Sequence, residues 1–104
     1  MTKTELYTAL SGVIDTYYDS APVKTPVPYA AFTWKHPNNF SADNKVFQKV
    51  ATVTIEVYSN APDTESAIDD LLDSLDLFWT SSGAFEASDG AYTIIYNLEV
   101  IDNA

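Results

Sequence analysis

The chain has 104 residues, 46 % of them hydrophobic, and a formal net charge of −10. This length fits one domain, and the hydrophobic content is that of a globular protein rather than a disordered chain. The chain has no cysteine, which excludes disulfides, thiolate catalysis and cysteine-ligated zinc. It also has no arginine, and residues 61–104 carry ten acids and no base. Binding to nucleic acid by neutralising phosphates is therefore not expected.

The N-terminal segment, residues 1–20, is expected to be helical. Thr2 and Glu5 have the spacing of a capping box, in which each side chain accepts a hydrogen bond from the other residue's backbone amide. Apolar residues follow at helical spacing, namely Leu6, Leu10, Val13 and Ile14. These signals predict a helix over about residues 3–18, weakened at Gly12.

Residues 21–28 are expected to form a stiff extended linker, because prolines at 22, 26 and 28 lack amide donors and restrict the residue before them. Residues 29–60 are expected to contain strands and a loop, with a first strand at Tyr29–Trp34 and a long one at Lys45–Tyr58. Apolar residues alternate with polar ones along the long run, the apolar set being Ala51, Val53, Ile55 and Val57. Because this run far exceeds a usual strand, we expect its first half to project as a β-arm with an exposed edge.

An acidic helix is expected over residues 62–79, because turn residues and acids precede a leucine-rich stripe. A C-terminal hairpin is expected over residues 84–101, since an Asp-Gly pair precedes an alternating strand that starts near Tyr92. The fold class is therefore α+β, with an antiparallel sheet packed against two helices in the order α-β-β-α-β-β and a long protruding β-arm or hairpin.

The sequence offers little catalytic chemistry. His36 is the only histidine and stands beside a proline, without a second imidazole or a thiol to share a metal. The three glycines are isolated, so there is no phosphate-binding loop. Helical aspartates lack the looped arrangement that calcium sites use. We expect no enzyme activity, catalytic residue, metal site or cofactor, and no membrane association.

Three segments together resemble a known group of proteins. They are the Asn39–Phe47 bend with its Asn-Phe-Ser-Ala-Asp-Asn-Lys-Val-Phe sequence, the Val53–Tyr58 strand with Ile-Glu-Val-Tyr, and the closing strand from Tyr92 to Val100. Over residues 5–101 the chain resembles the tail-completion, head–tail joining or tail-terminator-like proteins of long-tailed phages and prophages of Gram-positive bacteria. The closing acidic helix departs from that pattern, since it has no lysine.

The resemblance implies a structural subunit of a homo-oligomeric ring, hexameric in such proteins, at the phage neck or tail. DNA passes through such a ring without specific binding, and the implied partners are the tail tube protein and a head-closure or connector protein. The implied location is the virion, after assembly in the host cytoplasm. Within this frame the oligomer interface is expected at Asn39, Phe40, Asp43, Asn44, Lys45, Phe47 and Lys49. The acids expected to face the lumen are Asp69, Asp70, Asp73 and Asp76, because cations there would hold phosphate and slow the DNA.

A different class of function stays open at this point. An acidic domain of this size is also compatible with a DNA mimic that inhibits a DNA-binding protein by presenting carboxylates in place of phosphates. A plain interaction module is a third possibility. The blandest interpretation of the acidic surface is a solvated face that keeps the protein soluble.

Overall fold

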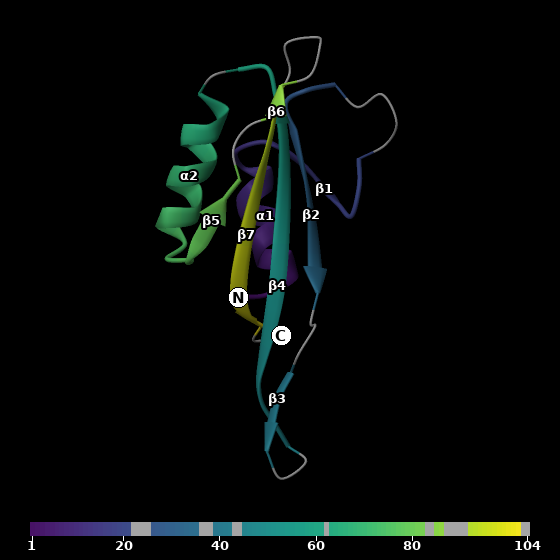
Figure 1. Cartoon of the computed structure of the whole chain (residues 1–104), viewed down its shortest axis with the longest axis vertical. Coiled ribbons are helices and arrows are strands. Elements are labelled where there is room, and N and C mark those ends of the chain that lie inside the picture. Colours follow the sequence, from purple (N-terminus) through teal and green to yellow (C-terminus); the bar gives the residue numbers. More distant parts are fainter. Residues whose placement is uncertain are drawn as a thin grey trace.

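A mixed β-sheet carries two helices in the computed structural model, which describes residues 1–21, 26–35, 39–42, 45–61, 63–82, 85–86 and 92–102 (Figure 1). The elements are α1 (Lys3–Ser11), β1 (Asp15–Tyr18), β2 (Tyr29–Lys35), β3 (Asn39–Ala42), β4 (Lys45–Ser59), α2 (Thr64–Ser74), β5 (Trp79–Ser81), β6 (Phe85–Glu86) and β7 (Tyr92–Asp102). The sheet runs in the order β1-β2-β4-β7-β5, while β3 pairs with β4 and β6 pairs with β7. Only the β1–β2 pair is parallel; the other pairs are antiparallel.

Strand β4 lies at the centre of the sheet. It pairs with β7 from Lys49 to Ser59 and with β2 from Thr52 to Tyr58. Side chains of a strand alternate between the two faces of the sheet, and burial along β4 follows that alternation. The fully buried set, each with 0 % exposure, is Ala51, Val53, Ile55, Val57 and Ser59.

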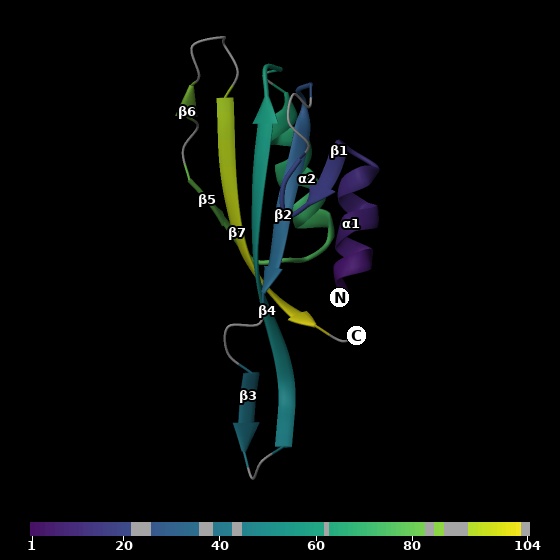
Figure 2. The same cartoon turned by 90° about the vertical axis from the view of Figure 1, so that its right-hand side faces the viewer.

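Both helices cover the same face of the sheet, as Figure 2 shows. Leu6 and Leu10 of α1 and Ile68 and Leu72 of α2 are fully buried. They join one apolar cluster with the inward residues of β2, β4 and β7. At roughly 25 cal/mol per Å² of apolar area removed from water, this shared core is the main source of the stability of the fold.

The expected N-terminal helix is too long, and the expected element order is wrong. Helix α1 begins with the capping box of Thr2 and Glu5 but ends at Ser11, with Gly12 as its C-cap. Residues 15–18 form strand β1 beside β2. Thr16, Tyr17 and Tyr18 are β-branched or aromatic, which favours a strand. Gly12 before them has a low helix propensity. Strands β3 and β5 also fall outside the expected order.

The expected long β-arm is not matched either. The Lys45–Tyr58 run is mainly a central strand, because its alternating apolar residues are buried between two neighbouring strands. Only Lys45–Gln48 lies beyond the register with β7, and there β4 pairs with β3 as a short hairpin below the sheet (Figures 1 and 2). The long edge that was expected to be exposed is therefore mostly paired within the chain.

Helix α2 ends earlier than the expected boundary of the 62–79 segment. The amide of Asp76 donates to the carbonyl of Asp73 at 3.1 Å, and the amide of Leu77 donates to the carbonyl of Leu72 at 3.3 Å. These two bonds form a Schellman motif, which closes a helix through a residue in the left-handed conformation. That residue is Asp76, with φ of 58°. Glycine usually occupies this position. Because aspartate stands there instead, the sequence did not indicate where the helix ends.

The remaining expected segments lie partly outside the described residues. Residues 22–25 of the linker and the Asp89–Gly90 turn are in that undescribed part. Strand β6 pairs with the start of β7, with Phe85 opposite Thr93.

Because the backbone of Asp76 has a left-handed conformation, we expect the Asp76→Gly substitution to stabilise the protein. We expect a gain of up to about 1 kcal/mol in the free energy of unfolding, because glycine removes the strain of a side chain at positive φ. Urea unfolding followed by circular dichroism measures the change. The matched control is Asp70→Gly in the interior of α2, which should cost roughly 1 kcal/mol. An equal loss of unfolding free energy in both variants would contradict the Schellman motif at Asp76.

Candidate functional site

The acids assigned to a lumen are divided by the structure into two groups. Asp69 accepts a hydrogen bond from the Tyr96 hydroxyl at 2.8 Å, and Asp73 accepts one from the Trp79 indole nitrogen at 2.9 Å. Buried tyrosine and tryptophan need such partners for their polar atoms. Asp69 and Asp73 thus tie α2 to β7 and to β5.

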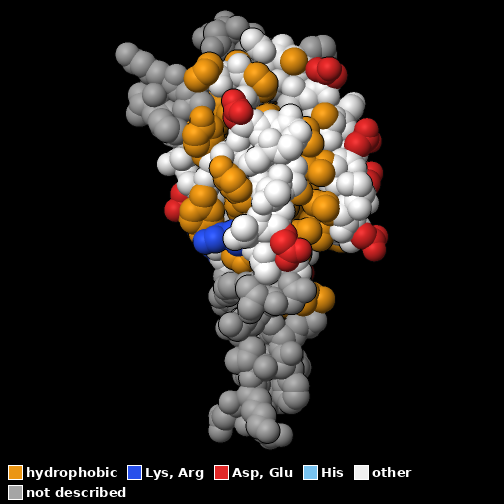
Figure 3. Space-filling model, turned by 180° about the vertical axis from the view of Figure 1, so that it is seen from behind, with side chains coloured by type: hydrophobic (Ala, Val, Ile, Leu, Met, Phe, Trp, Pro, Cys, Tyr) orange, Lys and Arg blue, Asp and Glu red, His pale blue; other side chains and the backbone are white. Residues whose placement is uncertain are grey.

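Asp70 and Asp76 are exposed, as is Asp73 beyond its bond to Trp79. In Figure 3 acidic side chains follow the right-hand border of the molecule, where α2 lies, and lysine atoms lie towards the opposite border. The sequence predicted this acidic helix but not the two hydrogen bonds, because nothing in the order of residues shows which strand packs beneath α2.

The residues expected to form an oligomer interface gather on the β3–β4 hairpin. Asn39 and Phe40 belong to β3, and Lys45, Phe47 and Lys49 belong to β4. Asn39 lies opposite Lys49 in the pairing register. The other two expected interface residues, Asp43 and Asn44, lie outside the described residues, as does His36.

A second face of the sheet carries no helix. There Tyr17, Tyr29 and Tyr58 form an aromatic row: the rings of Tyr29 and Tyr58 stack with centroids 4.8 Å apart, and Tyr17 meets Tyr29 edge-on at 6.1 Å. The Tyr58 hydroxyl donates to Oε2 of Glu56 at 2.6 Å. This hydrogen bond, together with burial and the nearby negative charge of Glu56, raises the pKa of Tyr58 to about 12.

An aromatic pocket lies at the β1 edge of the sheet. Phe32 is buried in it, and the half-exposed rings of Tyr7 and Tyr18 lie 6.5 Å and 5.5 Å from the Phe32 ring. Lys3 places its ammonium 4.2 Å from the centre of the Tyr18 ring, a cation–π contact. The pocket holds about 140 Å³. This pocket was not predicted, because residues 15–18 were expected to be helical. The signal that could have revealed it is the β-type composition of those residues.

Phe78 lies near the opposite edge of the sheet. The helix expected over residues 62–79 included it, together with Leu77 and Trp79. Leu77 and Trp79 do pack against the core, but Phe78 between them is 81 % exposed. Extended chain alternates its side chains between two sides, so burying Leu77 and Trp79 turns Phe78 outward.

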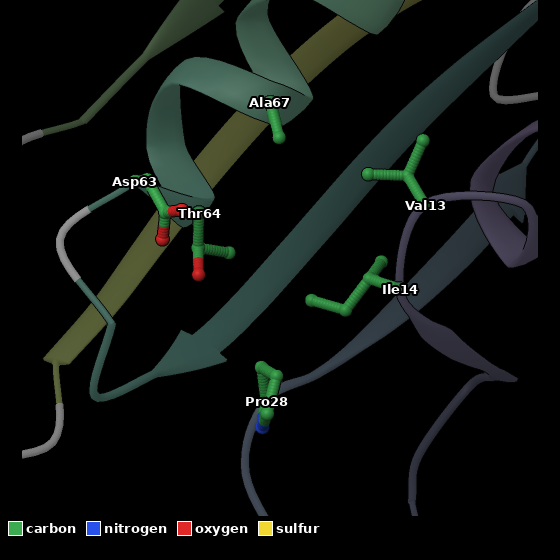
Figure 4. A pocket seen from close by; sticks show the side chains of 6 residues that line it. All are labelled: Val13, Ile14, Pro28, Asp63, Thr64 and Ala67. Atoms are coloured by element: carbon green, nitrogen blue, oxygen red, sulfur yellow. The ribbon is translucent and has the colours of Figure 1, made fainter.

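A further hollow of about 170 Å³ lies between the start of α2 and the segment after α1 (Figure 4). Asp63 and Thr64 line it from α2, opposite Val13 and Ile14. The Thr64 hydroxyl lies 2.7 Å from the hydroxyl of the buried Ser59, so its polar atom already has a partner inside the chain. This hollow brings together no pair of acid and base among its described lining residues.

Within the described ranges, no group of three or more histidine, cysteine or acidic side chains is placed to hold a metal ion. No helix described in the chain is long and apolar enough to span a bilayer. No family model matches the sequence, and no curated protein matches it. Three features of the described residues are candidates for contact with other molecules: the β3–β4 hairpin, the aromatic pocket and the exposed Phe78.

The bond between Tyr58 and Glu56 predicts a dependence of stability on high pH. A tyrosine whose pKa is raised on folding stabilises the folded state below its ordinary pKa of 10.0, and that contribution is lost as pH rises to about 12. The free energy of unfolding of the wild type should therefore fall towards that of Tyr58→Phe over this interval. Urea unfolding of both proteins across the interval measures it. A difference between them that stays constant with pH would contradict the bond.

Proposed function

We propose that this chain is a structural subunit of a phage neck or tail, a tail-completion or head-to-tail joining protein that assembles into a homo-oligomeric ring. The ring is hexameric in this proposal, and DNA passes through it without specific binding. The proposal includes contacts with a tail tube protein or a head-closure protein, and no chemical reaction.

The observation that carries the proposal is the β3–β4 hairpin beyond the main sheet (Figure 2). From Lys45 to Gln48, β4 pairs with β3 and with no other described strand. An isolated two-stranded hairpin is only marginally stable in water and needs further packing. A neighbouring copy is a natural source of that packing, since a free strand edge recruits another chain.

The two edges of the sheet support a ring rather than a two-fold dimer. Strand β1 forms one edge, and the short strands β5 and β6 lie at the other. The edges differ in composition, because the β1 edge has Lys3 and an aromatic pocket while the β5 edge lies beside the acidic α2. Contacts between unlike surfaces are heterologous, and they produce closed rings when the rotation between copies closes.

The acids of α2 fit a lumen in part. Asp70 and Asp73 are exposed and can face DNA, since a surface without cations does not retain phosphate. Asp69 is only partly exposed and bonds to Tyr96, so its first role is within the subunit. In this proposal Asp70 and Asp73 line the channel, and Asp69 holds α2 on the sheet.

Self-association across a concentration series tests the proposal. Sedimentation velocity and native mass spectrometry should detect a closed hexamer-sized species whose population increases with protein concentration. A chain that stays a monomer or dimer up to its solubility limit contradicts the ring. If that monomer also displaces DNA from a basic DNA-binding protein, the DNA-mimic function is favoured instead.

Amide hydrogen exchange on the same samples tests whether the hairpin is the contact. The amides of Lys45–Gln48 should exchange quickly in the monomer and be protected in the assembled form, because exchange reports local opening. The amides of Thr52–Val57 serve as the internal control, since strands on both sides protect them in either state. Equal exchange of Lys45–Gln48 in the two states would exclude the hairpin from the interface.

A further inference from the structure

The aromatic pocket at the β1 edge has the size and chemistry of a receptor for a phenyl ring. Its volume of about 140 Å³ is close to that of an apolar cavity of roughly 150 Å³ that accepts benzene. The walls are Tyr7 and Tyr18, each 44 % exposed, and Phe32 is 1 % exposed. Aromatic rings favour edge-to-face contact with a further ring, so such walls select an aromatic guest.

The charge at the rim of this pocket is positive. Lys3 is the one charged residue among those described as lining it. Its ammonium lies over the Tyr18 ring, which holds the charge beside the opening. An aromatic guest flanked by carboxylates would therefore be complementary to this pocket.

The same chain carries such a guest at its other edge. Phe78 is 81 % exposed, and Asp76 and Glu99 line hollows together with it. Met1 lines one of these hollows too, and its terminal ammonium donates to the carbonyl of Ile101 at 3.0 Å. The Schellman turn and the burial of Leu77 and Trp79 hold Phe78 outward. Aromatic side chains that project from a surface are common anchors at protein interfaces.

The pocket and Phe78 lie at opposite edges of the sheet. Strand β1 is at one edge of the sheet and β5 is at the other, in both Figure 1 and Figure 2. Phe78 is exposed and is not among the residues that line the pocket of its own chain, so that pocket is open to a second copy. Single exposed apolar residues are common and need no partner. Phe78 differs from such residues because it matches the pocket in size, aromatic character and charge.

We infer that Phe78 of one copy inserts into the Lys3–Tyr7–Tyr18–Phe32 pocket of the next copy. Asp76 and Glu99 of the first copy then face Lys3 of the second. The contact is heterologous, so each copy uses one pocket and one Phe78, and repetition closes a ring or extends a filament. This inference rests on the proposed ring and names the surfaces that join its subunits.

Site-specific photo-cross-linking tests the insertion directly. The probe is p-benzoylphenylalanine in place of Phe78, in a mixture of isotope-labelled and unlabelled chains that distinguishes contacts between copies from those within one. The expected product joins position 78 of one copy to a peptide of another copy that contains Tyr7, Tyr18 or Phe32. Cross-links that lie only elsewhere would overturn the inference.

Substitutions give a second, independent measurement. Phe78→Ala should weaken self-association about tenfold or more, as expected for a central aromatic anchor. The matched control is Val13→Ala, an exposed apolar residue outside both surfaces, which should leave self-association unchanged. Lys3→Glu should also weaken association, and Asp76→Lys in the same chain should restore it. Lys3→Glu places an acid in the first turn of α1, where it does not harm the helix.

The outcomes separate this inference from the proposed function. If the wild type assembles, but Phe78→Ala associates as well as Val13→Ala does, the Phe78 contact is overturned and the ring remains. If the wild type does not assemble at any concentration, both are overturned. Circular dichroism and thermal unfolding of each variant verify that a loss of association is not a loss of folding.

Discussion

The two-sided pairing of β4 is the constraint on which the rest of this structure depends. Its inward residues from Ala51 to Ser59 are fully buried, β7 pairs with it from Lys49 to Ser59, and β2 pairs with it from Thr52 to Tyr58. A shift of register by one residue would move the whole apolar set to the other face. The same register fixes where Tyr96 and Trp79 lie, and through their bonds to Asp69 and Asp73 it fixes α2. The position of Phe78 follows from the way α2 ends.

Central placement of the long strands leaves the edges of the sheet to short ones. Strand β1 has four residues and β5 has three. Short edges are a common protection against uncontrolled pairing between chains. Association then has to depend on side chains and on the hairpin, and these can be specific in a way that a bare strand edge is not. The unlike edges favour repeated head-to-tail contacts of the kind that build a ring.

Local patterns predicted some parts of this fold well. The alternation from Ala51 to Val57 identified the buried face of β4, and Thr2 with Glu5 identified the start of α1. Information that depends on distant contacts was missing. The sequence did not show that Thr52–Tyr58 is paired on both sides, and therefore the edge of the long run was wrongly expected to be free. Asp76 in a glycine-type position likewise concealed the end of α2.

The candidate contact surfaces were less predictable than the fold. Tyr7, Tyr18 and Phe32 come from α1, β1 and β2, and only the parallel β1–β2 pairing brings Tyr18 opposite Phe32. Phe78 looked like a core residue, because apolar neighbours surround it in the sequence. Phe78 is exposed because of the direction that the backbone takes after the Schellman turn. The order of residues does not show that direction.

Mixing two assembly-deficient variants tests the heterologous contact most directly. The Phe78→Asp variant keeps the aromatic pocket but lacks the Phe78 side chain that would insert into it. The Tyr7→Asp variant keeps Phe78 but has a disrupted pocket. An equimolar mixture should form a dimer of the two variants and stop there, because only one contact between Phe78 and the pocket can form and the hairpin contact does not assemble the ring without it. Native mass spectrometry would detect that dimer, with each variant monomeric alone. A mixture that stays monomeric, or that forms the full ring, would contradict the account.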